Sequence, residues 1–327
     1  MSGGMVEKGR DGGSSATRGA TELGGGAKRG RERGMSPFRL SMRRLARDRS
    51  AMVAAAIITA FIATALVAGT GAFGIKEAAT VFNENSLDTM RYLPVGTEGH
   101  VLGTDGFGRD VLARSIMGIR TALYLGYLAG LMTVPIALLL GAVAGWYGGL
   151  LDDAVTWLMS VVVAVPGILL IMSLIQIVGK SFTTMAFAFA VTGWVGLARV
   201  VRGAFLQARE SEYVLAARAL GAGDARIVFR HVLPNVFHFV TVNFVLQFVG
   251  VVKSEVFLAF VGLTLVGEAT WGSMIDAARS EVSSGRWQNL IGPTLFMGIF
   301  LMAMTVFGDS LRDALDPKLK NAEEVRS

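Results

Sequence analysis

Two sets of residues could bind a nucleotide or a metal, and neither has the spacing that such chemistry needs. The Gly-Lys-Ser at residues 179–181 imitates the end of a phosphate-binding loop, but that loop requires another glycine five positions before Gly179, where the chain has Leu174. The three histidines show no metal-ligand spacing: His100, His231 and His238. We therefore expect no ATP site, no metal, no cofactor and no catalytic group in this chain, which predicts that it is not an enzyme.

A third set of polar side chains lies inside an apolar stretch that runs from residue 236 to about residue 265. At 100° per residue of a helix, four of them fall within about 60° of one another and form one stripe. They are Asn243, Gln247, Gly250 and Ser254, and the stripe is flanked by Lys253 and Glu255. Charges at membrane depth face a bundle interior or a wet cavity. The stripe therefore either lines a translocation path or joins neighbouring helices by hydrogen bonds.

A polar stretch between two apolar ones, residues 203–235, has the pattern of two short helices joined by a turn, and we call it the helical hairpin. On its first helix, Tyr213, Ala216, Ala217 and Leu220 recur at i, i+3, i+4 and i+7, which places them on one face. Gly221 stands where that helix should end, because glycine adopts the left-handed cap conformation without a Cβ clash. The small residues predict a face that another surface can approach closely.

The second helix of the hairpin is predicted to begin at Asp224, whose side chain can cap it and whose charge suits its N-terminal dipole. Arg226 and Arg230, four residues apart, form a basic ridge on this helix. Pro234 is predicted to end the hairpin, because proline lacks the amide hydrogen that would continue the helical bonding.

The composition places these groups in a membrane protein. Of 327 residues, 52% are hydrophobic and only 17% are charged, and the apolar residues gather in long runs without charge. A helix needs about 20 such residues to cross a bilayer, and six runs are long enough or nearly so. The expected spans lie at residues 51–75, 120–152, 153–180, 181–198, 236–265 and 290–308. The chain has no cysteine, which excludes disulfides and thiolate metal sites.

The arginines predict the orientation, because cytoplasmic loops carry an excess of basic residues. Between residues 38 and 50, directly before the first expected span, lie five arginines: Arg39, Arg43, Arg44, Arg47 and Arg49. Between residues 199 and 230 there are six arginines and only three acidic residues. Both termini and the hairpin are therefore predicted to be cytoplasmic. The Gly- and Arg-rich residues 1–37 have the composition either of a disordered, solvated tail or of an RNA-binding segment, and beside a membrane span we expect the tail and no nucleic-acid partner.

The chain is thus divided into predicted segments. Residues 1–37 are a disordered cytoplasmic tail, and residues 38–50 a basic helix attracted to anionic headgroups of the lipid bilayer. Residues 51–75 form the first transmembrane helix, and residues 76–120 an extracytoplasmic segment. Residues 121–310 hold the other five helices together with the cytoplasmic loop at 203–235, and residues 311–327 are a cytoplasmic tail.

Several motifs in this chain resemble one family of membrane proteins. The Ala-Ala-Arg-Ala-Leu-Gly at 216–221 and the Arg-His-Val-Leu-Pro-Asn at 230–235 resemble the "EAA" loop of ABC-importer permeases, in the dipeptide/oligopeptide permease family. Residues 102–110 resemble the family's LGTDxxGRD signature, and we expect a structural turn followed by a short helix there. Residues 308–317 resemble its GDxLRDxLDP ending, and residues 271–274 its Trp-Gly-x-Met element. The motif's glutamate is replaced by Leu215, and the prolines that commonly precede Trp271 are missing.

The resemblance covers residues 36–319 and implies an all-α integral membrane protein with the type I ABC-importer permease fold and six transmembrane helices. It implies a C-type permease subunit that works with a homologous second permease, two cytoplasmic ATPase subunits that bind ATP and Mg²⁺, and an extracytoplasmic substrate-binding protein in a bacterial cytoplasmic (inner) membrane. The residues that it assigns to the coupling loop are Glu212, Ala216, Ala217, Arg218, Gly221, Asp224, Arg226 and Pro234.

The resemblance leaves the substrate open. Dipeptides or oligopeptides are the expected cargo, and nickel or oligosaccharides are alternatives within the same family. A different class, an ion-coupled secondary transporter, would also consist of spans with intramembrane charges, and Lys253 with Glu255 could then form an ion relay. Such transporters are commonly built from internal repeats, and the motifs of this chain are not repeated.

Overall fold

The structure, a computed structural model, describes residues 42–71, 74–80, 91–97, 99–265 and 267–315. Within these ranges the regular structure is helical. The predicted tail at 1–37 and the last residues of the chain, 316–327, lie outside the described residues. Five long helices form the body of the protein: α3 (Arg49–Gly69), α6 (Val111–Tyr147), α9 (Phe182–Arg209), α12 (Leu233–Phe260) and α14 (Gln288–Leu315).

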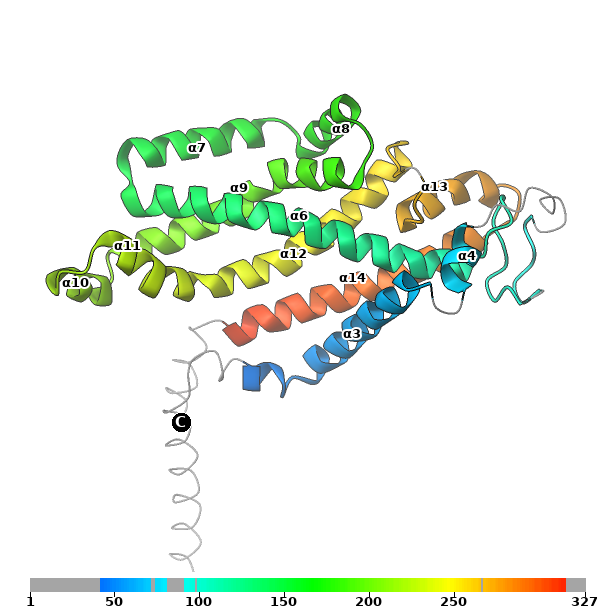
Figure 1. The fold of residues 1–327 in the computed structure, drawn as a ribbon, viewed down its shortest axis with the longest axis horizontal. Coiled ribbons are helices and arrows are strands. Elements are labelled where there is room, and N and C mark those ends of the chain that lie inside the picture. Colours follow the sequence, from blue (N-terminus) through cyan, green and yellow to red (C-terminus); the bar gives the residue numbers. More distant parts are fainter. Residues whose placement is uncertain (1–41, 72–73, 81–90, 98, 266, 316–327) are drawn as a thin grey trace, which may run out of the picture.

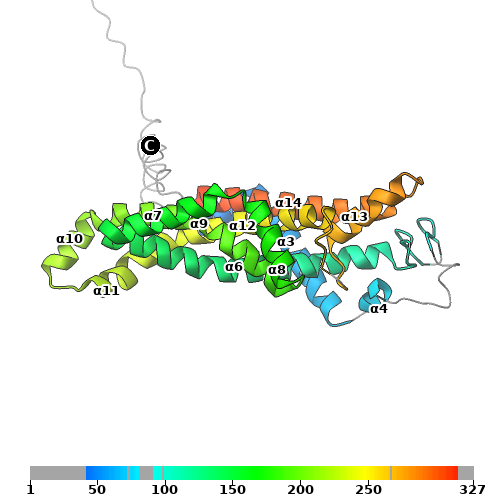
Figure 2. The same cartoon turned by 90° about the horizontal axis from the view of Figure 1, so that it is seen from above.

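The shorter helices lie between the long ones and at their ends. They are α4 (Ile75–Thr80), α7 (Gly149–Ala164), α8 (Gly167–Val178), α10 (Glu212–Ala219), α11 (Asp224–Ile227), the π-helical turn η2 (Val228–Val232) and α13 (Trp271–Val282). The long helices lie side by side, with α10 and α11 at one end of the molecule and α4 and α13 at the other (Figures 1 and 2). We call the first the hairpin end (residues 203–235) and the second the polar end (residues 91–97, 99–110 and 267–288).

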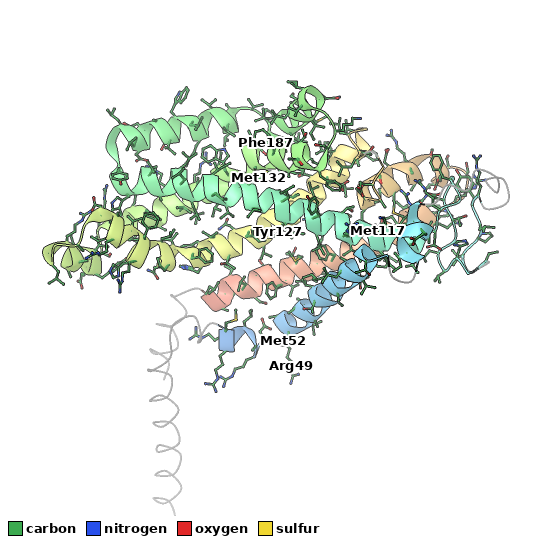
Figure 3. All side chains as sticks on the ribbon, viewed as in Figure 1. Arg49, Met52, Met117, Tyr127, Met132 and Phe187 are labelled. Atoms are coloured by element: carbon green, nitrogen blue, oxygen red, sulfur yellow. The ribbon has the colours of Figure 1, made fainter. Side chains whose placement is uncertain are left out.

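The described residues contain five helices that are long and apolar enough to cross a membrane, or six if the bent pair α7–α8 counts as one span. The pair is bent by 83° between Ala164 and Gly167, so the third expected span is not one straight helix. Val165 has extended backbone angles, as the residue before a proline prefers, and Pro166 cannot continue the hydrogen bonding of α7. Large apolar side chains such as those of Met52 and Phe187 are exposed on the outside of the helices (Figure 3), where a lipid phase would cover them.

The helix boundaries differ from the predicted spans. Helix α6 begins at Val111 rather than near residue 121, α9 continues to Arg209, and α14 continues to Leu315. The predicted spans end where the uncharged runs end, and these runs mark the part of a helix inside the hydrocarbon layer. A helix continues into the wet zone beyond it, because its backbone amides hydrogen-bond to carbonyls of the same helix. At about 1.5 Å per residue, the 37 residues of α6 reach about 55 Å, well beyond a hydrocarbon core of about 30 Å.

The structure also changes the bounds or the content of three other predicted segments. The first span ends at Gly69 rather than residue 75, and α4 follows it. Of the basic segment 38–50, residues 42–45 are helical, but Asp48 starts α3 as a separate helix by accepting from the Ser50 amide. Between the expected spans at 236–265 and 290–308 lies a further helix, α13, whose start is capped reciprocally by Thr270 and Ser273.

The centre of the fold is the packing of α6 along α9. Two glycines of α6 make this packing close, Gly141 and Gly145. A Cβ at Gly141 would lie 2.6 Å from the carbonyl oxygen of Ala198, and one at Gly145 would lie 2.5 Å from that of Arg202. Both distances are too short for any other residue, so these positions require glycine. The spacing of four is the small-residue pattern of contacting membrane helices, a signal that was present in the sequence but was not used for the predictions.

Candidate functional site

The first helix of the hairpin, α10, ends as the sequence predicts. Gly221 has φ of +81°, the left-handed region that favours glycine. The amide of Gly221 donates to the carbonyl of Arg218 at 2.9 Å, and the amide of Ala222 donates to that of Ala217 at 3.0 Å. These two bonds form a Schellman motif, which satisfies carbonyls at the end of the helix. The turn between α10 and α11 is therefore fixed by the backbone itself.

Asp224 does not cap the second helix, which corrects the prediction. The capping position is Gly223, with extended backbone angles, and Asp224 is the first residue of α11. Its carboxylate instead accepts a hydrogen bond from Arg218 at 3.3 Å, across the turn. Both side chains are largely exposed, so this ion pair adds little to stability. The pair nevertheless connects the two helices of the hairpin on their solvent side.

Pro234 does not end the hairpin, which is a second correction. Helices α11, η2 and α12 form one continuous helical run, Asp224–Phe260, and Pro234 lies in the first turn of α12. A proline inside a helix removes one hydrogen bond, and its ring crowds the carbonyl four residues earlier. The π-helical turn at Val228–Val232 directly precedes it and widens the helix at that point. The hairpin is therefore joined to α12 without a break.

The outer surface of the hairpin carries exposed apolar side chains. Tyr213 and Leu220 are exposed, Leu220 by 89%, and Ala216 is exposed between them. Ala217, predicted on the same face, is instead half-buried and packs inward with Ala222. On the second helix, Phe229 is 70% exposed. The predicted loop residues Glu212, Arg226 and Arg230 are also exposed. This outer surface combines apolar groups with a basic ridge.

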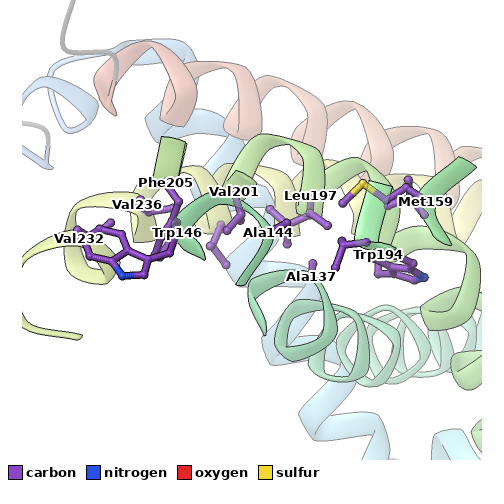
Figure 4. Packing of buried hydrophobic residues seen from close by; sticks show 14 of the residues in the cluster. Ala137, Ala144, Trp146, Met159, Trp194, Leu197, Val201, Phe205, Val232 and Val236 are labelled. Carbon is purple, nitrogen blue, oxygen red and sulfur yellow. The ribbon is translucent and has the colours of Figure 1, made fainter. Parts of the chain in front are cut away.

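The underside of the hairpin is buried against the ends of α6 and α9. Val214 of α10 and Ile227 of α11 have no exposed surface, and neither does Phe205 of α9. The rings of Trp146 and Phe205 meet edge to face, with centroids 6.5 Å apart. Figure 4 shows Trp146, Phe205, Val232 and Val236 grouped in this cluster. Arg218 also lies over the Trp146 ring, 5.3 Å from its centroid. The hairpin and the ends of these two helices therefore form one packed unit.

The predicted polar stripe on α12 is divided by the structure. Gln247 donates to Thr133 of α6 at 2.6 Å, and Asn243 donates to the carbonyl of Phe239 on its own helix at 2.8 Å. Ser254 is half-buried. Glu255 is buried, and its carboxylate lies against Gly272 in the first turn of α13. Lys253 is exposed. Gln247 and Glu255 thus contact other helices of the chain, whereas Lys253 faces outward.

The polar end is held by a buried network around Asp105. The Asp105 carboxylate accepts from the amides of Phe107 and Arg109 at 2.9 Å and from the Arg109 side chain at 2.8 Å. Arg114 of α6 is buried 3.6 Å from the same carboxylate. The predicted turn is present, but the helix after it is the long α6. Asp105 was not identified as the centre of the network, because the sequence alone does not show which acid the arginines share.

Two further contacts belong to the polar end. Asp110 caps α6 by accepting from the Ala113 amide at 2.6 Å and also contacts His100. Glu281 of α13 accepts from the Asn289 side chain at 2.9 Å. Burial raises the pKa of the Glu281 carboxyl above its usual value, and the bond from Asn289 opposes that shift only in part.

Lys180, in the imitation of a phosphate-binding loop, has a structural contact. Its ammonium donates to the carbonyl of Gly262, just beyond the end of α12, at 2.8 Å. A cation at the C-terminal end of a helix is favourable for the helix dipole. Among the residues that the structure describes, no three His, Asp or Glu side chains are grouped so that they could hold a metal ion.

Comparison with known proteins gives the class of this fold and site. Residues 137–321 match the family described as the inner membrane component of binding-protein-dependent transport systems. The chain belongs to that family, and it is a multi-pass protein of the inner membrane with a transport role, in systems that also contain ATPase and binding-protein subunits.

The relatives of the chain include permeases of peptide transport systems. The chain is 38% identical to the dipeptide transport system permease protein DppC of Bacillus subtilis over 233 residues, which is 71% of this chain and 72% of the relative. It is 34% identical to the oligopeptide transport system permease protein OppC of the same organism, over 68% and 73% of the two chains. A chain of the inward-facing MetNI methionine ABC transporter has the same fold, with a TM-score of 0.50 and 18% identity, over 62% of this chain and 96% of that chain.

Proposed function

We propose that this chain is the permease subunit of an ATP-driven importer of dipeptides or oligopeptides. The observation that carries the proposal is the hairpin, which exposes apolar and basic groups on its outer surface while its underside is locked to α6 and α9. A surface of this kind can dock on a separate subunit and transmit its motion. The names of the relatives, which are dipeptide and oligopeptide permeases, support the choice of cargo.

The partners follow from the same proposal. A homologous second permease completes the translocation path, two cytoplasmic ATPase subunits bind ATP and Mg²⁺, and an extracytoplasmic binding protein delivers the peptide. Closure of the ATPases moves the hairpin, and the packing of Val214 and Ile227 under it passes that motion to α6 and α9. Transport is then a shift of population between two packings of the helices.

The experiment that tests the function is uptake into proteoliposomes. The chain is reconstituted with the second permease, the ATPases and the binding protein, and uptake of a labelled dipeptide is measured with ATP or with an ion gradient. We expect uptake that needs ATP and both ATPases. Uptake by this chain alone, driven by an ion gradient, would instead indicate a secondary transporter. ATP-driven uptake of nickel or an oligosaccharide, without uptake of peptide, would show that the cargo is not a peptide.

The proposed orientation has a separate test, because the chain contains no cysteine. We propose that the hairpin end and both termini are cytoplasmic. Val95 and Gly223 are both exposed, one at the polar end and the other in the hairpin. In intact cells an impermeant thiol reagent should label Val95→Cys and should not label Gly223→Cys. Labelling of position 223 from outside would contradict the orientation.

A further inference from the structure

One face of α12 is exposed within the described residues. Its exposed positions recur at intervals of three, four and seven residues, which aligns them along the helix. They are Phe239, Leu246, Gly250, Lys253, Phe257 and Phe260, and we call them the open face. The other sides of α12 pack against α6, α9, α13 and α14. Among the described residues, the open face is therefore the side of α12 that the other helices leave exposed.

Lys253 is an unusual residue to find on such a face. It lies seven residues before the end of α12, which is about 10 Å inside the helix. A charged side chain at this depth is costly in contact with lipid, so it faces a wet cavity or an opposite charge, or extends along the helix to the membrane interface. Among the described residues, no carboxylate forms an ion pair with Lys253. Its neighbour Glu255 is buried against α13 and points away from the open face.

A second cation lies at the end of the same face. The guanidinium of Arg279, in α13, stacks on the ring of Phe260, 4.7 Å from its centroid, and its side chain is exposed. Asp276 and Glu281 lie three residues before and two residues after it on α13, and within the described part of the chain neither forms an ion pair with it. The open face therefore ends in two exposed cations with the rings of Phe257 and Phe260 between them along the chain. The stacked guanidinium is held in place and still has N–H groups to donate.

We propose that Lys253 and Arg279 receive a carboxylate of the transported molecule as it passes along α12. The inference rests on the proposed function and adds to it a specificity site for anionic cargo. Lys253 supplies a mobile point charge, and Arg279, which stacks on Phe260 about 10 Å further along α12, supplies a fixed fork of donors, so each can bind a carboxylate in turn. The phenylalanines beside them suit an apolar side chain next to that carboxylate. Gly250 lies about one turn before Lys253 on α12. No other side chain or backbone among the described residues lies within 4 Å of where a Cβ of this residue would be, so cargo can approach the backbone there.

The test compares a peptide that has a free C-terminal carboxylate with the same peptide amidated at that end. Initial ATP-driven uptake of each is measured in proteoliposomes that hold the assembled importer and a saturating concentration of loaded binding protein. The quantity is the ratio of the two rates, relative to that ratio for the unmodified importer. Any preference of the binding protein itself then cancels, because the same binding protein serves every variant.

We expect Lys253→Met to lower this ratio about tenfold, mainly through slower uptake of the free acid, because a charge-assisted hydrogen bond is lost. Arg279→Met should lower it about threefold, and Lys253→Arg should keep it within about twofold. The matched control is Lys76→Met, which removes an exposed lysine of α4 away from the open face and should change nothing.

Three outcomes decide the matter. A falling ratio in Lys253→Met with unchanged amide uptake supports the site. Equal losses for both peptides would overturn it and would assign Lys253 to a carboxylate of the second permease or to a lipid phosphate. An unchanged ratio and rate would also overturn it. If the unmodified importer takes up neither peptide although it hydrolyses ATP, the proposed peptide cargo fails, which is a different result from a loss of selectivity.

Discussion

The two ends of the molecule are held together by opposite kinds of interaction. At the hairpin end, Val214, Ile227 and Phe205 form a dry apolar cluster, while Leu220 and Phe229 are left uncovered on top. At the polar end, buried charges around Asp105 find their partners inside the chain. Apolar side chains that stay exposed on a surface can mark an interaction site, whereas buried ion pairs and hydrogen bonds hold a loop in one arrangement. The buried charges around Asp105 hold the polar end in place, and the exposed apolar groups of the hairpin support the proposal that it docks on another subunit.

The first prediction breaks the polar end. Asp105→Ala removes the acceptor of two amides and leaves Arg114 buried beside an empty space. Removing one partner of a buried ion pair costs about 3 to 5 kcal/mol, so we expect a large drop in the melting temperature of the purified protein. Residues 91–110 should also become sensitive to protease. Glu77→Gln, at an exposed position of α4, is the control. A melting temperature equal to that of the control would mean that the network does not hold this end.

The second prediction breaks the close packing near the hairpin end. Gly145→Ala would place a methyl group 2.5 Å from the carbonyl oxygen of Arg202, so α6 and α9 must separate. Overpacking of this kind costs about 1 to 3 kcal/mol. Gly203→Ala is the matched control, because Gly203 is exposed on α9 and nothing lies near its Cα. It should be neutral or stabilising by up to about 1 kcal/mol. Similar melting temperatures for the two variants would contradict the packing.

The third prediction, which has the smallest expected effect, is that the stability of the protein depends on pH through Glu281 at the polar end. The pKa of the Glu281 carboxyl is raised by burial in the folded protein. A carboxyl whose pKa is raised by folding stabilises the folded protein when it is protonated. This contribution to stability is present below the unfolded pKa of about 4.5 and is lost as pH rises through the folded pKa. The melting temperature should therefore fall as pH rises from about 4.5 towards neutral. Glu281→Gln should flatten this part of the curve, and an equally steep curve in that variant would show that another group is responsible.

The sequence predicts the membrane class, the helical hairpin and the turn at Gly221, because uncharged runs, periodicity and a glycine at a cap are local signals. It does not predict that the helix passes through Pro234, because the compensating π-helical turn has no pattern of its own. It also does not give the bend of 83° between α7 and α8, because the angle depends on packing against other helices.

The candidate site is less visible in the sequence than the fold. Periodicity placed Ala217 with Tyr213 and Leu220, but the neighbouring helices decide that Ala217 packs inward. The stripe on α12 was seen as one feature, whereas Gln247 and Lys253 face different surroundings. Partners such as Asp105 for Arg114, or Thr133 for Gln247, lie far away in the sequence or compete with nearby alternatives. Such contacts follow from tertiary packing and leave no local pattern.

The central claim is that the hairpin couples this permease to its ATPases, and Leu220 tests it most directly. Leu220 is 89% exposed, so Leu220→Asp should leave the permease folded, whereas Asp at the half-buried Ala217 would also disturb its own core. In a docked interface the new carboxylate would be buried without a partner, at a cost of several kcal/mol.

The measurement is co-purification of the ATPase subunits, together with ATP-driven uptake, for Leu220→Asp and for the control Val95→Asp at the polar end. The melting temperature of each variant confirms that it is folded. We predict that Leu220→Asp loses both the ATPases and uptake, while Val95→Asp keeps the ATPases. Retention of the ATPases and of uptake at the unmodified level in Leu220→Asp would contradict the coupling role of the hairpin.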